Sequence, residues 1–169
     1  NDPIPGVIAK WLPEGVNKRL TERLNRDEVR TPMQWTSASG AGFCDDNVTP
    51  WLPINENHVT RNVADESSDP NSLLSLYRDL LGRRRATPAL HSGELRLSAT
   101  ESEAILAFER VHGEERVLTV ANLGEVATDH RLVGGPWSLD LATARGVEMS
   151  EGSQLLRLPS HSAALLILR

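Results

Sequence analysis

The sequence predicts a mainly β chain, in which a C-terminal antiparallel β-sandwich follows an irregular loop segment and one amphipathic helix. Three features lead to this fold class. Prolines are dense in the first third, apolar residues recur at helical spacing in the middle, and short apolar runs alternate with turn residues in the last third. Several short strands at such spacing are typical of a sandwich. We divide the chain into residues 1–90 and a sandwich domain at residues 91–169.

The first third is predicted to be irregular, because prolines interrupt both helices and sheet ladders. One short helix is expected from Val16 to Asn25. A long segment without regular structure is uncommon inside a self-sufficient domain, so it should pack on something else, carry function, or both. The prolines of this segment stand at positions 3, 5, 13, 32, 50 and 53.

The middle of the chain gives the clearest helix. Asp69 is predicted to cap it and Pro70 suits its first position. The helix should end near Arg85, because Pro88 forces the preceding residue out of the helical region. Its apolar stripe must be buried against a partner. The stripe consists of Leu73, Leu76, Tyr77, Leu80 and Leu81.

The last third changes from helical spacing to short apolar runs separated by turn signals. The hairpin around His112-Gly113 is the most secure, because a short turn joins two β-prone runs. The expected strands are Gly93–Ser98, Ala104–Val111, Arg116–Asn122, Thr128–Leu132, Trp137–Leu141, Gln154–Leu158 and Ala163–Leu168.

Composition excludes several function classes. The 169 residues carry a net charge of −5 and form no basic stripe, so no nucleic-acid partner is expected. No apolar run approaches the length of a membrane span, and no membrane association is expected. The single cysteine, Cys44, fits a reducing compartment and indicates a cytoplasmic protein. Aromatic residues make up only 4%, which is low for a protein that binds sugars by ring stacking.

No catalytic, metal or cofactor site follows from the residue patterns. The five histidines are scattered and lack the spacing of metal ligands. No glycine-rich phosphate loop is present. Neighbouring carboxylates such as Asp45-Asp46 point to opposite faces of a strand and are more typical of solvated surface than of a glycosidase pair. We therefore assign no catalytic residue, no metal ligand and no cofactor.

The most informative stretch runs from Arg26 to Trp35 with the sequence RDEVRTPMQW. Arg26 and Arg30 could present planar donors to a carboxylate or to sugar hydroxyls. From chemistry alone, a pair of surface arginines in ion pairs is the favoured alternative. Trp35, Phe43 and Trp51 are expected to pin the loop by burying their rings.

This stretch resembles the RTPMQW segment of α-glucosidases in the α-amylase family of glycoside hydrolases, a group that includes oligo-1,6-glucosidases and trehalose synthases. The resemblance continues through PWLP at residues 50–53 and DPNSLL at residues 69–74. It implies that residues 1–90 are the loop and last helix of a (β/α)₈ barrel. A complete barrel needs roughly 250 residues, and no βαβ repeat occurs here. The catalytic carboxylates would then precede Asn1.

The resemblance also implies a function. The parent enzyme would be a retaining α-glucosidase that acts on α-linked gluco-oligosaccharides, and this chain alone would be inactive. Arg26 would help to hold the terminal glucose, and Arg30 would shape the same side of the pocket. Thr36 stands where many relatives have Asp or Ser, which leaves the preferred linkage open. The implied partners are the α-glucoside substrate and the missing barrel domain.

Two other function classes remain open from the sequence. The chain could be a stand-alone carbohydrate-binding sandwich, although its β-rich third holds only Phe108 and Trp137 as aromatics. Binding of maltose or glycogen by residues 93–169 would favour that class. The chain could also be a structural or partner-binding domain, with the apolar helix stripe as its interface. Self-association would favour this last class.

Overall fold

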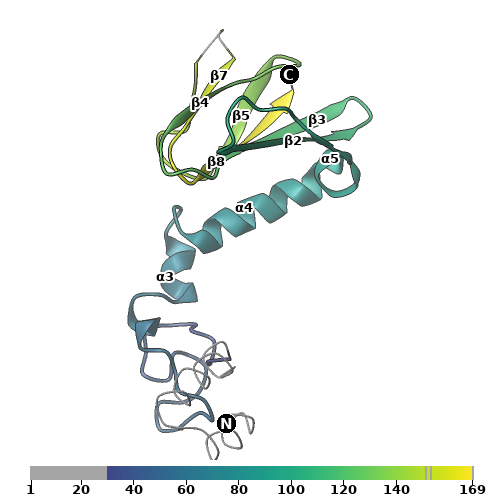
Figure 1. Ribbon diagram of the computed structural model, residues 1–169. Coiled ribbons are helices and arrows are strands. Elements are labelled where there is room, and N and C mark those ends of the chain that lie inside the picture. Colours follow the sequence, from purple (N-terminus) through teal and green to yellow (C-terminus); the bar gives the residue numbers. More distant parts are fainter. Residues whose placement is uncertain (1–29, 151, 153, 169) are drawn as a thin grey trace, which may run out of the picture. The chain divides into compact units, whose positions relative to one another are not determined.

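The computed structural model describes residues 30–150, 152 and 154–168 (Figure 1). The chain divides into two compact units, Asn1–Ser75 and Leu76–Arg169. The helix expected between Val16 and Asn25 lies outside the described residues, as does Arg26.

The described part of the first unit is largely irregular, as predicted, but it contains two short helical elements. The 3₁₀ helix η2 spans Glu56–Val59 and the helix α3 spans Val63–Ser68. Asn62 caps α3, because its side-chain oxygen accepts a hydrogen bond from the backbone N–H of Asp65 at 3.0 Å. Neither element was expected, since six residues are too few to show a helical apolar period.

The helix α4 spans Leu73–Ala86, and its N-terminal cap differs from the prediction. The Ser72 hydroxyl accepts from the backbone N–H of Ser75 at 3.1 Å, which is the geometry of an N-cap. Asp69 instead accepts from the N–H of Asn71 at 2.8 Å in the turn before the helix. The expectation that Asp69 caps the helix was wrong, because its side chain closes that local turn instead.

Two arginines at the end of α4 make hydrogen bonds with residues beyond the helix. The Nε atom of Arg83 donates to the Asp140 carboxylate at 2.6 Å. A guanidinium nitrogen of Arg84 donates to the carbonyl of Leu90 at 2.9 Å. The helix α5, Pro88–Ser92, follows at once, and its first free N–H, that of Ala89, donates to Glu115 at 2.7 Å. These contacts fix the end of α4 and the whole of α5 against the sandwich.

The last third is an antiparallel sandwich, which confirms the predicted fold class (Figure 1). One sheet has five strands in the order β1-β2-β3-β8-β5, and the other has three strands in the order β4-β7-β6. The strands are β1 Glu94–Leu97, β2 Ile105–His112, β3 Glu115–Asn122, β4 Thr128–Arg131, β5 Trp137–Ala142, β6 Glu148–Ser150, β7 Leu155–Leu158 and β8 Ser162–Leu168.

Seven of these strands fall on the seven predicted ones with boundaries shifted by at most one residue, whereas β6 was missed. The β6 strand has three residues, and only Met149 among them is apolar. Such a strand leaves no alternating pattern to detect. The predicted hairpin is present, with β2 and β3 joined at Gly113, whose φ of 59° suits glycine.

The sandwich core lies between the two sheets and contains one fully buried polar residue, Asn122. Its side-chain amide contacts the carbonyl oxygens of Val126, Leu158 and Pro159 within 3.2 Å. Its side-chain oxygen accepts from the N–H of Gly124. Because these hydrogen bonds satisfy its own buried amide and reach both segments, Asn122 ties the loop after β3 to the end of β7.

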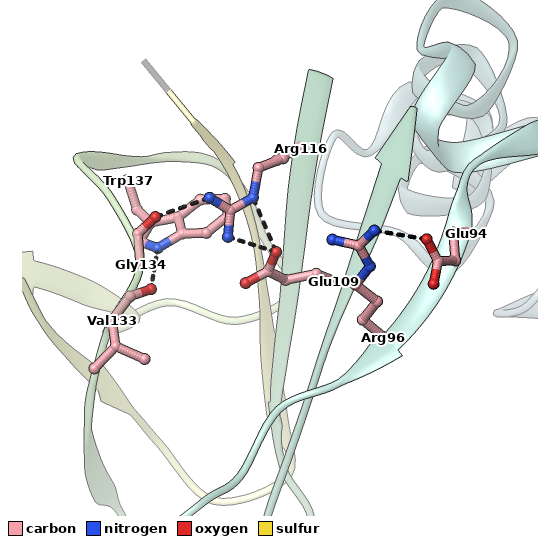
Figure 2. A network of polar contacts seen from close by, with 7 residues as sticks. All are labelled: Glu94, Arg96, Glu109, Arg116, Val133, Gly134 and Trp137. Carbon is pink, nitrogen blue, oxygen red and sulfur yellow. Dashed lines mark hydrogen bonds and ion pairs between the residues drawn. The ribbon is translucent and has the colours of Figure 1, made fainter. Parts of the chain in front are cut away.

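A polar network closes one edge of the core (Figure 2). Two nitrogens of Arg116 donate to the carboxylate of Glu109 on the neighbouring strand, at 3.0 and 2.7 Å. The same guanidinium lies 5.3 Å from the ring centroid of Trp137 and donates to the carbonyl of Gly134 at 2.9 Å. The indole N–H of Trp137 donates to Val133 at 2.8 Å. The indole N–H of this buried tryptophan is therefore satisfied.

Candidate functional site

Arg30 is exposed and lines a small concave surface of about 200 Å³ on the loop of the first unit. Two aromatic residues, Phe43 and Trp51, line the same concavity. The remaining lining residues are Thr31, Pro32, Met33, Pro50 and Leu52. The structure thus brings Arg30 beside two of the three aromatic residues that the sequence analysis singled out.

Backbone hydrogen bonds hold the loop in a defined shape. The N–H groups of Trp35 and Thr36 both donate to the carbonyl of Ala41, at 2.8 and 3.1 Å. Ala41 is fully buried, and the following Gly42 has a φ of 64°. A side chain at Gly42 would stand 3.1 Å from the β-carbon of Trp35. Ala41 also has a positive φ, of 51°, but the close approach to Trp35 makes glycine necessary at position 42.

The loop is also attached to the start of α3 and to the 3₁₀ helix. The backbone N–H groups of Val63 and Ala64 donate to the carbonyls of Gln34 and Trp35, both at 3.0 Å. The side-chain amide of Gln34 donates to the carbonyl of Asn55 at 3.3 Å. Main-chain polar groups, rather than buried rings, thus keep this loop in place.

The prediction that the three aromatic rings pin the loop was wrong. Trp35 is 48% exposed, Phe43 is 52% exposed and Trp51 is 75% exposed. The hydrogen bonds described above replace the apolar anchors that a long loop usually needs. The rings are consequently available for contact with a ligand or with another part of a larger protein.

The acidic pair on the loop serves the loop itself. A carboxylate oxygen of Asp46 accepts from the N–H of Gly40 at 3.0 Å. Hydrogen bonds from Ser39 and then from Gly40 hold the pKa of Asp46 below its usual value. Any β-carbon at Gly40 would stand 2.1 Å from the carbonyl oxygen of Cys44, so the turn is tightly closed there. Asp46 is therefore engaged in closing a turn.

Within residues 30–150, 152 and 154–168, no group of three or more His, Cys, Asp or Glu side chains could hold a metal ion. Cys44 is a free thiol, whose sulfur lies 3.5 Å from the carbonyl of Val48. No helix in the described part of the chain has the length and hydropathy required to cross a bilayer.

A second surface of interest is the outer face of the five-stranded sheet, on the side away from the sandwich core. Cross-strand register places Leu97, Phe108, Thr119 and Leu165 in one row on this face. The helix α5 covers part of the face, with Ala89 packed against Val117 and Leu165. Beside α5 lies a groove of about 400 Å³, lined mainly by apolar side chains. The sequence analysis missed this face.

The apolar stripe of α4 is only partly covered. Leu76 and Leu80 are half-buried, and Leu80 lines the groove on the sheet. Leu73 is 63% exposed, Tyr77 is 58% exposed and Leu81 is 51% exposed. The predicted burial of the whole stripe is therefore not met by the described residues of this chain. Its exposed members remain available to a partner.

Comparison with known proteins identifies the family of the chain. Residues 11–93 match the family described as "Alpha amylase, catalytic domain". The chain is 42% identical over 107 residues to a probable α-glucosidase of Rhizobium meliloti, and 35% identical over 125 residues to a probable oligo-1,6-glucosidase of Bacillus subtilis. This chain belongs to the α-amylase family.

The solved structures agree with that assignment and include the sandwich. A trehalulose synthase from Pseudomonas mesoacidophila superposes with a TM-score of 0.78 at 28% identity, over 90% of this chain and 28% of its own length. An isomaltulose synthase from Klebsiella gives a TM-score of 0.71 at 29% identity, over 86% of this chain and 26% of its own. The chain spans 19% of the length of each of the two curated relatives, with 63% and 74% of its own residues aligned.

Proposed function

We propose that this chain forms part of an α-glucosidase-type glycoside hydrolase that acts on α-linked gluco-oligosaccharides. One observation carries the proposal. The family match over residues 11–93 includes the loop that the structure holds in a defined shape, with Arg30 and exposed aromatic rings at one concavity. In this proposal the loop supplies one wall of the substrate pocket, and the catalytic carboxylates come from another part of the enzyme.

The chemistry of such an enzyme sets the tasks of this chain. In a retaining glycosidase, one carboxylate attacks the anomeric carbon while a carboxylic acid protonates the leaving oxygen, and water then releases the sugar. Both steps need the sugar ring to be held still. We assign that task to Arg26, for the terminal glucose, and to Arg30, for the same side of the pocket. A guanidinium suits it, because its planar donors match pairs of hydroxyl oxygens.

The domain division follows from the same proposal. Residues 1–90 would complete the catalytic barrel as a loop and its last helix, and residues 91–169 would form the C-terminal sandwich. The described residues support this division, because the family match ends at residue 93, just before the first strand of the sandwich.

The barrel is the proposed partner of the uncovered apolar surfaces. The exposed members of the α4 stripe and the partly open outer face of the five-stranded sheet both belong to the second unit or to the helix that enters it. Exposed apolar surface can mark an interface. We also propose a cytoplasmic location, which the free Cys44 supports because a reducing compartment keeps thiols free.

The stand-alone carbohydrate-binding module is not favoured. The two aromatic residues of the sandwich are unsuited to sugar stacking, because Trp137 is only 2% exposed and Phe108 is half-buried. The exposed rings of Trp35, Phe43 and Trp51 instead lie in the part that matches the catalytic domain.

Reconstitution tests the proposal. The chain is mixed with a separately produced barrel domain of the α-glucosidase group, and release of glucose from maltose and isomaltose is measured. We expect hydrolysis by the mixture and none by the chain alone. An Arg30→Ala chain should support at least tenfold less activity, whereas Arg131→Ala, which removes an exposed arginine from the sandwich strand β4, should support full activity. Glucose release by the chain alone would contradict the assignment of the carboxylates to another part.

A further inference from the structure

The helix α4 is held on the sandwich with little help from packing. None of its 14 residues is buried. Leu80 and Arg84 line the groove of about 400 Å³ together with strands of the five-stranded sheet, so open space separates part of the helix from the sheet. An isolated helix of this length is marginally stable in water. Contacts other than apolar burial must therefore give α4 its direction relative to the sandwich.

The short helix α5 is, by contrast, firmly seated on the same face of the sheet. Only Thr87 separates it from α4. Ala89 is fully buried against side chains of β3 and β8. Its backbone N–H donates to Glu115 at 2.7 Å, and its carbonyl accepts from Nε of Arg110 at 3.2 Å. These contacts attach the end of α4 to β2 and β3, but one point of attachment leaves the direction of a helix undefined.

A second point of attachment lies on a different strand. Nε of Arg83 donates to the carboxylate of Asp140 at 2.6 Å, and another guanidinium nitrogen donates to the Asp140 backbone carbonyl at 3.3 Å. The two side chains are 31% and 30% exposed, so water screens this ion pair only in part. Asp140 belongs to β5, the edge strand farthest from β1 in the sheet. Because α5 is attached at β2 and β3, the two points together define the direction of α4.

We propose that the sandwich is the scaffold that sets the direction of α4, and that Asp140 is the positioning residue. The inference goes beyond the proposed function, because it does not depend on a substrate. The helix lies within residues 11–93, which match the catalytic domain, yet from Leu76 onward it belongs to the same compact unit as the sandwich. The exposed side chains of Tyr77 and Leu81 are then presented in a direction that the sandwich fixes.

Spin labels on the helix and on the sandwich measure this direction. Asp79→Cys on α4 and Arg131→Cys on β4, both exposed positions, are labelled in a Cys44→Ser chain. Double electron–electron resonance then gives the distribution of distances between the two labels. With Asp140 intact we expect one narrow distribution. Asp140→Ala removes the carboxylate and should broaden it, whereas Asp140→Glu, which keeps a carboxylate within reach of Arg83, should restore most of the wild-type width.

Hydrogen exchange on the same chains shows whether the effect is local. In Asp140→Ala, the amides in the last turn of α4 should exchange about three to ten times faster, as expected for the loss of one partly screened ion pair. The amides of β3 and β8 should exchange as in the wild type. Faster exchange throughout the sandwich would show that Asp140 stabilises the sheet as a whole, and this result would overturn the positioning role.

Glu94→Ala is the matched control. Glu94 is also an acidic residue on an edge strand of the same sheet, with an arginine partner at 2.6 Å, but that partner is Arg96 of the same strand. This variant should leave the distance distribution unchanged. Equal broadening in Glu94→Ala would overturn the inference, and so would an unchanged distribution in Asp140→Ala, because α5 alone would then set the direction of α4. No sugar takes part in these measurements, so neither result bears on the proposed function.

Discussion

The loop and the sandwich use their tryptophans in opposite ways. In the loop, Trp35 and Trp51 are exposed, and the backbone is held by hydrogen bonds to Ala41 and to the start of α3. In the sandwich, Trp137 is buried in the core, with its N–H satisfied and Arg116 over its ring. The comparison teaches that one region has its apolar core within this chain, whereas the other presents apolar surface outward.

Replacing a tryptophan by alanine in each region should give the largest difference in the free energy of unfolding. Trp137→Ala should lower the free energy of unfolding of the chain by about 3–5 kcal/mol, because it empties a core position, removes the ring beside Arg116 and takes the indole donor from the Val133 carbonyl. Trp51→Ala should change it by less than about 0.5 kcal/mol. Urea denaturation followed by far-ultraviolet circular dichroism measures both. Similar losses of unfolding free energy in the two variants would show that the loop and the sandwich do not differ in how they use these rings.

Two glycine substitutions test how the backbone conformation of the loop differs from that of α4. Gly42→Ala should destabilise the loop by about 1–2 kcal/mol, because Gly42 has a positive φ and stands close to Trp35. Gly82→Ala is the matched change in the interior of α4, where nothing lies within 4 Å of the new β-carbon. It should stabilise the helix by about 0.5–1 kcal/mol.

Hydrogen exchange can assign each effect to its region. Gly42→Ala should speed the exchange of the amides of Trp35, Thr36 and Val63, and leave those of β3 and β8 unchanged. Faster exchange in the sandwich as well would contradict this prediction, because it would mean that the two units unfold together.

Sequence patterns predicted the sandwich far better than they predicted the loop. The strands could be located because apolar residues such as those of β2 and β3 recur between turn signals. The exposure of Trp51 could not be predicted, because the sequence pattern around a tryptophan in a proline-rich loop is the same whether its ring is buried or exposed. The outer face of the sheet did leave a signal. The run Ala163–Leu168 is apolar without alternation, which indicates a strand covered on both faces.

The candidate site was only partly predictable for a similar reason. Arg30 was named through a resemblance, and the structure adds that it shares a concavity with Phe43 and Trp51. Spacing alone could not bring residue 30 beside residue 51, because that proximity depends on the reversal at Ala41 and Gly42. The cap of α4 illustrates the same limit, since Asp69 and Ser72 are both good capping residues and only the turn decides between them.

The smallest expected effect concerns pH and the sandwich alone. His130 in β4 is half-buried, and this burial lowers its pKa, with Glu101 acting weakly in the opposite direction. The unfolded chain then binds a proton more readily than the folded chain, at pH values between the lowered pKa and about 6.5. Stability from His130 is therefore complete above that window and is lost as the pH falls through it. His130→Gln should lose less stability than the wild type between pH 8 and pH 5 in urea denaturation, whereas His112→Gln at the exposed hairpin should follow the wild type. A parallel loss in all three proteins would show that burial of His130 does not couple the sandwich to pH.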